Sequence, residues 1–131
     1  MGEQPGAELV REILNALNRQ DVAAVLARVH PDFEWRTLES SPVAGTYRGH
    51  EEVRGYMEDW LATFENVHID VEEMTKAGDE VLAVVRGHGR GRGSGIEVDN
   101  HYCQVWTVRE GAAVRMVEYD TRERALADLD W

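Results

Sequence analysis

The first part of the chain places apolar residues at the spacing of three and four that is typical of amphipathic helices. The stripe in residues 7–18 consists of Val10, Ile13, Leu14 and Leu17. A second, shorter helix is predicted from Asp21, a residue type that caps helix N-termini well, to the break at Pro31. Two helices are therefore expected before the first strand.

Residues 33–38 alternate in part between aromatic or apolar and polar side chains, which predicts a short strand. An irregular loop is predicted at Ser40, Ser41 and Pro42. A third helix is predicted to follow residues 45–50, with two acidic residues in its first turn, where the helix dipole favours them. Its broad aromatic stripe is typical of a helix that covers a sheet and consists of Val53, Tyr56, Met57, Trp60, Leu61 and Phe64.

After Asn66 the period of the pattern changes to two, which indicates β-strands. Four strands are predicted, at residues 67–72, 81–88, 97–108 and 114–120, and Thr121 begins a last helix or tail. The segment Gly89–Gly95 alternates glycine with small or basic residues. It lacks the Lys-Ser or Lys-Thr pair of a P-loop and does not lead into a helix, so we interpret it as a flexible hairpin end.

Helices followed by strands joined by turns are typical of an α+β domain, with a curved antiparallel sheet wrapped against the helices. The 131 residues fit one domain, 1–131. The formal net charge of -11 disfavours nucleic acid or an anionic membrane surface as a partner. Because no signal-like or membrane-spanning apolar run occurs, we expect a cytoplasmic protein. Cys103 is the only cysteine, so no internal disulfide is expected.

The strand predicted at 114–120 carries the most informative residue, Glu118. Alternation places Met116 and Glu118 on one face and Val117 and Tyr119 on the other, and both faces are partly apolar. A carboxylate on a buried face is costly unless it is paired, protonated or facing a cavity. We therefore expect the rest of the chain to build a cavity over this strand.

Three stretches resemble the nuclear transport factor 2-like superfamily, and in particular its SnoaL-like branch. They are Leu14–Asp21 between the first helices, Gly45–Glu51 at the entry to the third helix, and Val117–Tyr119 together with Ala125 and Leu126. The resemblance covers nearly the whole chain and implies a cone-shaped barrel with one pocket at its open end, often in a dimer that packs through the outer sheet face. This architecture hosts several unrelated activities, so the resemblance identifies a fold better than a reaction.

The chemistry of relatives can be compared position by position. In a comparison with limonene epoxide hydrolase, Arg86-Gly87-His88 falls where that family has an Arg-x-Asp pair on one strand. Glu118 falls where that family has an acidic residue on the last strand. Trp35 and Thr37 occupy the places of its Tyr and Asn. Against ketosteroid isomerase, the places of the central Tyr and Asp look like Ile13 and Thr37, so both are missing. A polyketide-cyclase interpretation would use Glu118 with His88 or His101.

The residues themselves support one candidate site. Arg86 and His88 are two apart and share a strand face; if that face is also the face of Glu118, a basic, a titratable and an acidic group meet. Glu118 would then act as general base while His88 or Arg86 assists the departing oxygen. A buried Glu-Arg ion pair without catalysis is the alternative. The candidate walls of the pocket are Trp35, Tyr47, Tyr56, Met57, Trp60, His101 and Met116.

Three hypotheses on function follow. The first is a hydrolase, cyclase or isomerase that needs no cofactor and acts by general acid/base catalysis on a small, largely apolar molecule. The second is a non-catalytic binding module for such a molecule, and the third is a dimerisation or accessory domain without a usable pocket. No metal site is expected, because the histidines are scattered. A homodimer is expected, since one barrel interior is unsuited to bury Tyr102, Trp106, Val117 and Tyr119 together.

Overall fold

The computed structural model describes residues 5–38 and 44–131, which form four helices and six strands. In chain order they are α1 (Pro5–Asn18), α2 (Val22–Ala27), β1 (Val29–Arg36), β2 (Thr46–Arg48), α3 (Gly49–Thr63), β3 (Phe64–Ala77), β4 (Glu80–Gly91), β5 (Glu97–Arg109), β6 (Ala112–Tyr119) and α4 (Arg122–Leu129). The predicted loop at 40–42 lies outside the described residues. None of these helices has the length and apolar character needed to cross a membrane.

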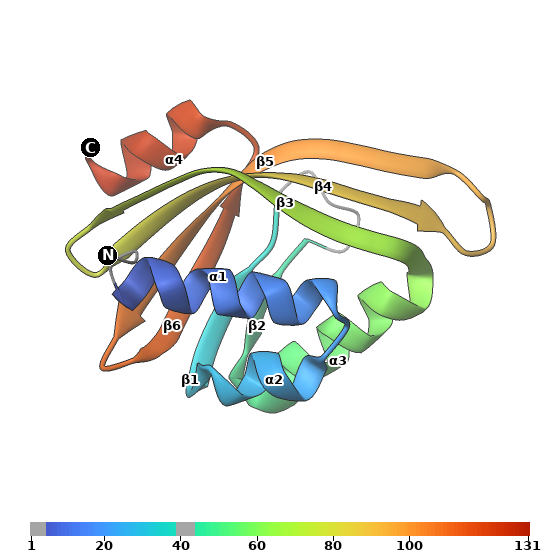
Figure 1. Ribbon diagram of the computed structural model, residues 1–131, viewed down its shortest axis with the longest axis horizontal. Helices are drawn as coiled ribbons and strands as arrows, with labels where there is room; N and C mark the ends of the chain where they lie inside the picture. The colour runs from blue at the N-terminus through green and yellow to red at the C-terminus, as the bar shows by residue number, and fades with distance from the viewer. Residues whose placement is uncertain (1–4, 39–43) are drawn as a thin grey trace.

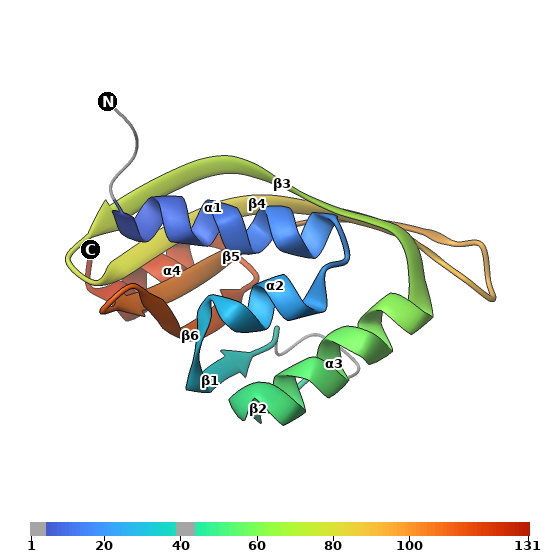
Figure 2. The ribbon, with the colours of Figure 1, turned by 60° about the horizontal axis from the view of Figure 1, so that its bottom comes forward.

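The six strands form one curved sheet in the order β2-β1-β6-β5-β4-β3. Figure 1 shows α1 lying across one face of this sheet while α4 lies on the other, and Figure 2 shows α2 and α3 on the same side as α1. We call the face toward α1, α2 and α3 the inner face and the face toward α4 the outer face. The α+β architecture with a curved sheet wrapped against the helices is therefore confirmed.

One strand pair departs from the expected antiparallel sheet. β1 runs parallel to β6, with Trp35 opposite Met116, whereas the other four pairs are antiparallel. A parallel pair needs a long crossover, and here α3 and four strands lie between the two partners in the chain. The sheet is consequently mixed, and its parallel pair joins the beginning of the chain to its end.

Several element boundaries also differ from the prediction. β1 begins at Val29 and includes Pro31, and its register with β6 shifts between Val29 and Glu34. A proline has no N–H for the ladder, so such an interruption is where it is tolerated. Phe64, expected on the third helix, has extended backbone and begins β3. The short strand β2 was not predicted, and Gly89–Gly91 continue β4 instead of belonging to the hairpin end.

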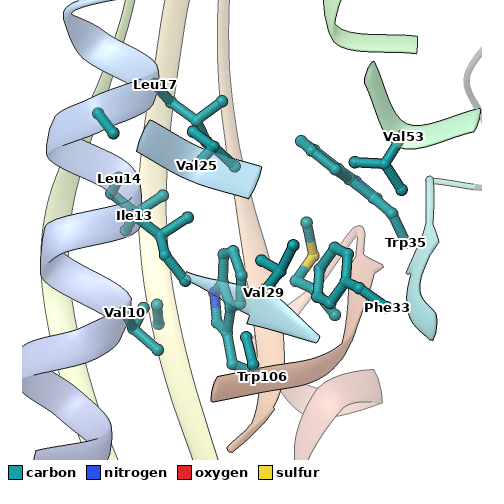
Figure 3. Packing of buried hydrophobic residues seen from close by; sticks show 14 of the residues in the cluster. Val10, Ile13, Leu14, Leu17, Val25, Val29, Phe33, Trp35, Val53 and Trp106 are labelled. Atoms are coloured by element: carbon teal, nitrogen blue, oxygen red, sulfur yellow. The ribbon is translucent and has the colours of Figure 1, made fainter. Parts of the chain in front are cut away.

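The main hydrophobic core lies between α1 and the inner face of the sheet. Figure 3 shows the α1 side chains Ile13 and Leu14 turned toward Trp106, and all three are at most 1% exposed. The ring of Trp106 stacks on Phe33 with centroids 6.2 Å apart. The helical stripe predicted for residues 7–18 is therefore the face that α1 buries.

A second, smaller cluster lies on the outer face, where Leu82, Cys103 and Val105 pack beneath Ala125 of α4, with Tyr119 beside them. Burial of Cys103 raises the pKa of its thiol. Because α4 of the same chain covers this apolar patch, the outward-facing residues by themselves do not require a second copy. The homodimer remains a prediction.

Candidate functional site

A cavity of about 560 Å³ lies between α3 and the inner face of the sheet. Its walls come from every strand and from α3, and most of its large side chains are aromatic. The lining residues are Trp35, Leu38, Tyr47, Tyr56, Asp59, Trp60, Thr63, Phe64, Val67, His68, Ile69, Gly87, His88, Gly89, Val98, Asn100, Tyr102 and Glu118. A cavity was expected over the last strand, and Glu118 of that strand is among the lining residues.

Two acidic residues line the cavity, and Glu118 is the one that is not exposed. Its Oε2 accepts a hydrogen bond from Trp35 Nε1 at 3.3 Å, and its Oε1 accepts one from the backbone N–H of Leu38 at 3.1 Å. Burial raises the pKa of the Glu118 carboxyl to about 7, although both hydrogen bonds favour the charged form and oppose the rise. The carboxyl is thus held in place and exchanges its proton near neutral pH.

Three aromatic rings in mutual contact line the cavity, beginning at Trp35 beside Glu118. Trp35 meets Tyr56 edge to face with ring centroids 5.2 Å apart, and Tyr56 stacks on Tyr47 at 4.5 Å. Burial raises the pKa of the Tyr56 and Tyr102 hydroxyls, and the nearby charge of Glu118 adds to the rise in both. Both hydroxyls therefore stay protonated and can donate hydrogen bonds to an oxygen atom in the cavity.

The cavity wall on β3 is fixed by a side chain of α1. Asn18 donates from Nδ2 to the carbonyl oxygen of Ile69 at 2.9 Å and accepts from the N–H of Ile69 at 2.8 Å. These two bonds satisfy the backbone of β3 where its ladder with β4 has register shifts on either side. Asn18 thereby holds Ile69 against the cavity.

Arg86 and His101 do not line the cavity of Glu118, and His88 lines it but pairs with Asp70, so the structure does not bring the predicted acid/base set together. Val81, Ala83 and Val85 of β4 lie in the main core, and alternation therefore turns Arg86 and His88 to the outer face. Met116 of β6 also lies in the main core, which places Glu118 on the inner face. Alternation along one strand left open whether the face of Arg86 and His88 is also the face of Glu118, and the register between the strands shows that it is not.

On the outer face these three residues take part in polar pairs. Arg86 binds Asp99 through two hydrogen bonds, at 2.8 and 2.5 Å. His88 Nε2 lies 2.7 Å from Asp70, and His101 Nε2 lies 3.5 Å from Glu72. The hydrogen bond with His88 lowers the pKa of Asp70. His88 is among the lining residues of the cavity, but its ring is engaged with Asp70.

The predicted walls divide into two groups. Trp35, Tyr47, Tyr56 and Trp60 line the cavity, as expected. Met57 and Met116 do not line it, because both are 0% exposed within the core. No group of three or more His, Cys, Asp or Glu side chains is arranged to hold a metal ion in residues 5–38 and 44–131.

Sequence reasoning missed much of the lining, most importantly Tyr102. The alternation of its strand placed Tyr102 on one face with Gln104 and Trp106, and Gln104 pairs with Glu118 in the register of β5 and β6. Only that register reveals that the face belongs to the cavity. The inward-facing Gly87 and Gly89 were also missed, because Gly87 has no side chain to mark its face and Gly89 was assigned to the hairpin end.

Comparison with known proteins identifies the fold and the family. A SnoaL-like domain model matches residues 10–116, and a search of the curated proteins finds no match. A nuclear transport factor 2-like protein of unknown function from Burkholderia pseudomallei is 20% identical, with 95% of this chain and 97% of that chain covered and a TM-score of 0.81.

Two further solved structures share this fold. A putative SnoaL-like polyketide cyclase from Jannaschia is 18% identical over 96% of this chain and 95% of that chain, with a TM-score of 0.77. A Mycobacterium tuberculosis protein in complex with estradiol-17beta-hemisuccinate is 17% identical over 92% and 97% of the two chains, with a TM-score of 0.79. The match of the domain model to most of its length shows that the chain belongs to the SnoaL-like domain family.

Proposed function

We propose that the cavity binds a small, largely apolar molecule and that Glu118 acts on it as a general acid/base without a cofactor. The observation that carries this proposal is the position of Glu118: a carboxyl with a pKa of about 7, held by two hydrogen bonds, in an aromatic cavity of about 560 Å³. A group whose pKa lies near the working pH is suited both to remove and to return a proton.

The other side chains fit this role. Tyr56 and Tyr102 line the same cavity as protonated hydroxyls, which can stabilise negative charge that develops on a substrate oxygen. Trp35 and the N–H of Leu38 hold the Glu118 carboxyl in one orientation. Proton transfer at a carbon or oxygen atom near Glu118, as in a cyclisation, an isomerisation or the opening of an epoxide, is the reaction class that we infer.

The apolar lining supports the class of molecule. Six of the lining residues are Trp, Tyr or Phe, and burying them against a ligand provides most of the binding free energy of such a site. The Mycobacterium tuberculosis protein is solved in complex with an estradiol ester, and the Jannaschia protein is described as a putative polyketide cyclase. Both relatives support the proposal, although they share only the fold with this chain.

Two assays test the proposal. The first is turnover of a panel of terpene and aromatic epoxides, and the second is incorporation of deuterium from D₂O into cyclic ketones, which NMR detects. Glu118→Gln should abolish the activity, and Glu118→Asp, which keeps the acid, should retain part of it. Glu58→Gln on the exposed side of α3 is the matched control and should behave as the wild-type protein does. Activity that survives in Glu118→Gln would refute the catalytic role.

The second candidate is a binding module without catalysis. It is favoured by the fact that both oxygens of Glu118 already accept hydrogen bonds from the protein, as a purely structural carboxyl would. In that case no compound of the panel turns over, while an apolar ligand binds wild-type protein and Glu118→Gln with similar affinity. The accessory-domain hypothesis expected no cavity near Glu118, and the cavity argues against it.

A further inference from the structure

Glycines alternate along the chain at positions 87, 89, 91, 93 and 95, and the sequence placed the last four of them in a flexible hairpin end. The structure divides the series into two groups. Gly91 supports the turn, where its N–H donates to the carbonyl of Ile96 at 2.9 Å. Gly87 and Gly89 instead lie within β4 and line the cavity. Glycine weakens a strand, so two inward-facing glycines in its interior require an explanation.

The register places each glycine between larger neighbours. Gly87 lies opposite Ile69 on β3 and Asn100 on β5, and Gly89 lies opposite Val98 on β5. All three partners line the cavity. The inner face of β4 is therefore a trough between two rows of side chains, because the middle strand contributes only backbone there.

The space above Gly89 accepts a side chain. A Cβ atom added at Gly89 would meet Val67 Cγ2 at 3.5 Å and Phe64 Cβ at 3.7 Å, which are ordinary contact distances. At Gly87 the same atom would come within 3.2 Å of Tyr102 Cε1, so this glycine lets the Tyr102 ring lie close to the sheet. Backbone conformation imposes glycine at neither position, since neither has a positive φ. Both glycines line the cavity, so the room that a side chain would occupy at these positions belongs to the cavity or to the Tyr102 ring.

We infer that Gly87 and Gly89 are specificity-determining residues, which open a distal subsite along β4 for the far end of an elongated, uncharged, largely apolar ligand whose polar end lies at Glu118. This inference rests on the proposed function. Gly89 sets the length of the ligand that the cavity accepts. Gly87 sets the depth of the cavity, because it determines how close to the sheet the Tyr102 ring lies. Phe64 and Val67 form the wall beside Gly89.

The inference is tested with two neutral probes that differ only in length, phenol and 4-phenylphenol, at pH 6.5. Quenching of tryptophan fluorescence reports binding, since Trp35 and Trp60 line the cavity, and calorimetry confirms it. The wild-type protein should bind 4-phenylphenol at least about tenfold more tightly, because the second ring buries additional apolar surface. Gly89→Val should remove most of this preference and leave the affinity for phenol unchanged within about twofold.

Gly93→Val is the matched control, because a Cβ at Gly93 in the turn meets nothing within 4 Å, and this variant should keep the wild-type preference. Gly89→Ala, which adds one atom at contact distance, should give an intermediate ratio and serves if Gly89→Val does not fold. A wild-type ratio in both Gly89 variants would overturn the inference. So would an equal loss for both probes, no preference in the wild-type protein, or binding of neither probe. The readout is a ratio of affinities, so failure of catalysis at Glu118 would leave it intact.

Discussion

Trp35 and Glu118, which are 83 residues apart in the chain, meet across the parallel pair of β1 and β6, where the indole Nε1 donates to the carboxylate at 3.3 Å. Two residues beyond the end of β1, the N–H of Leu38 donates to the other oxygen of the same carboxylate at 3.1 Å. The chain segment at the end of β1 thus holds a carboxyl whose pKa burial raises to about 7.

Replacing Trp35 by Phe should raise the pKa of Glu118 above its value of about 7. The hydrogen bond from Nε1 stabilises the charged carboxylate, so its loss favours the protonated form, by about one pKa unit for a charge-assisted bond. Carbon-13 NMR titration of the glutamate carboxyls measures this change. Trp60→Phe, which also changes a cavity tryptophan, is the control and should leave the titration unchanged; an unchanged pKa in Trp35→Phe would contradict the assigned bond.

The stability of the protein should fall as pH rises from about 5 to 8, and Glu118→Gln should lessen that fall. Burial raises the pKa of Glu118 from 4.5 to about 7, so between these values the folded state keeps a proton that the unfolded state loses. The stability due to the protonated carboxyl is complete below 4.5 and disappears as pH passes 7, a change of up to about 3 kcal/mol.

Urea denaturation of both proteins at pH 5 and pH 8 measures this effect. The difference in unfolding free energy, wild type minus Glu118→Gln, should be smaller at pH 8 than at pH 5. Glu58→Gln is the control, and its difference from the wild-type protein should not follow this trend. A difference that grows with pH would show that the folded state favours the ionised carboxyl, against the assigned direction.

Arg86→Gln and His101→Gln should leave ligand affinity and turnover within about twofold of the wild-type protein. Both side chains lie on the outer face, where they pair with Asp99 and Glu72, and neither lines the cavity. Steady-state kinetics beside Glu118→Gln provides the comparison. A loss from either variant as large as that from Glu118→Gln would return these residues to the site, as the first hypothesis had it.

Asn18→Asp should destabilise the fold by about 1–3 kcal/mol. The aspartate can still accept from the N–H of Ile69, but it presents an acceptor to the carbonyl of Ile69 in place of the donor that Asn18 Nδ2 provides. The same substitution at Asn15, on the exposed side of α1, is the control. Urea denaturation should separate the two variants, and equal stability would show that the bonds between Asn18 and β3 contribute little.

The homodimer should be tested directly by light scattering at micromolar concentration. The dimer is expected because large residues occur on both faces of the last strands. In the structure, however, Tyr102 and Trp106 pack in the main core or beside it, and Tyr119 packs beside α4. A dimer would therefore need to use other parts of the surface. A monomeric mass would contradict the prediction.

Local patterns predicted the elements well, because the helical stripe and the strand alternation are properties of neighbouring residues. The stripe of α1 and the paired faces of β5 and β6 agree with the structure. The prediction was weakest where the ladder is interrupted or a boundary depends on partners from elsewhere in the chain. Pro31 within β1 and the continuation of β4 through Gly91 both depend on neighbouring strands.

The sequence by itself determined that Glu118 lies on a partly buried strand face, since this follows from alternation. It also indicated a cavity lined by aromatic residues of the first strand and third helix, since a buried charge is costly. Only the tertiary structure decided which residues share that cavity. From their own strands alone, Arg86 and Glu118 could both face the interior. The strand pairing places them on opposite faces of the sheet, because a shift of one residue in register moves a side chain to the other face. The same register places Tyr102, Gly87 and Gly89 on the inner face, where they line the cavity.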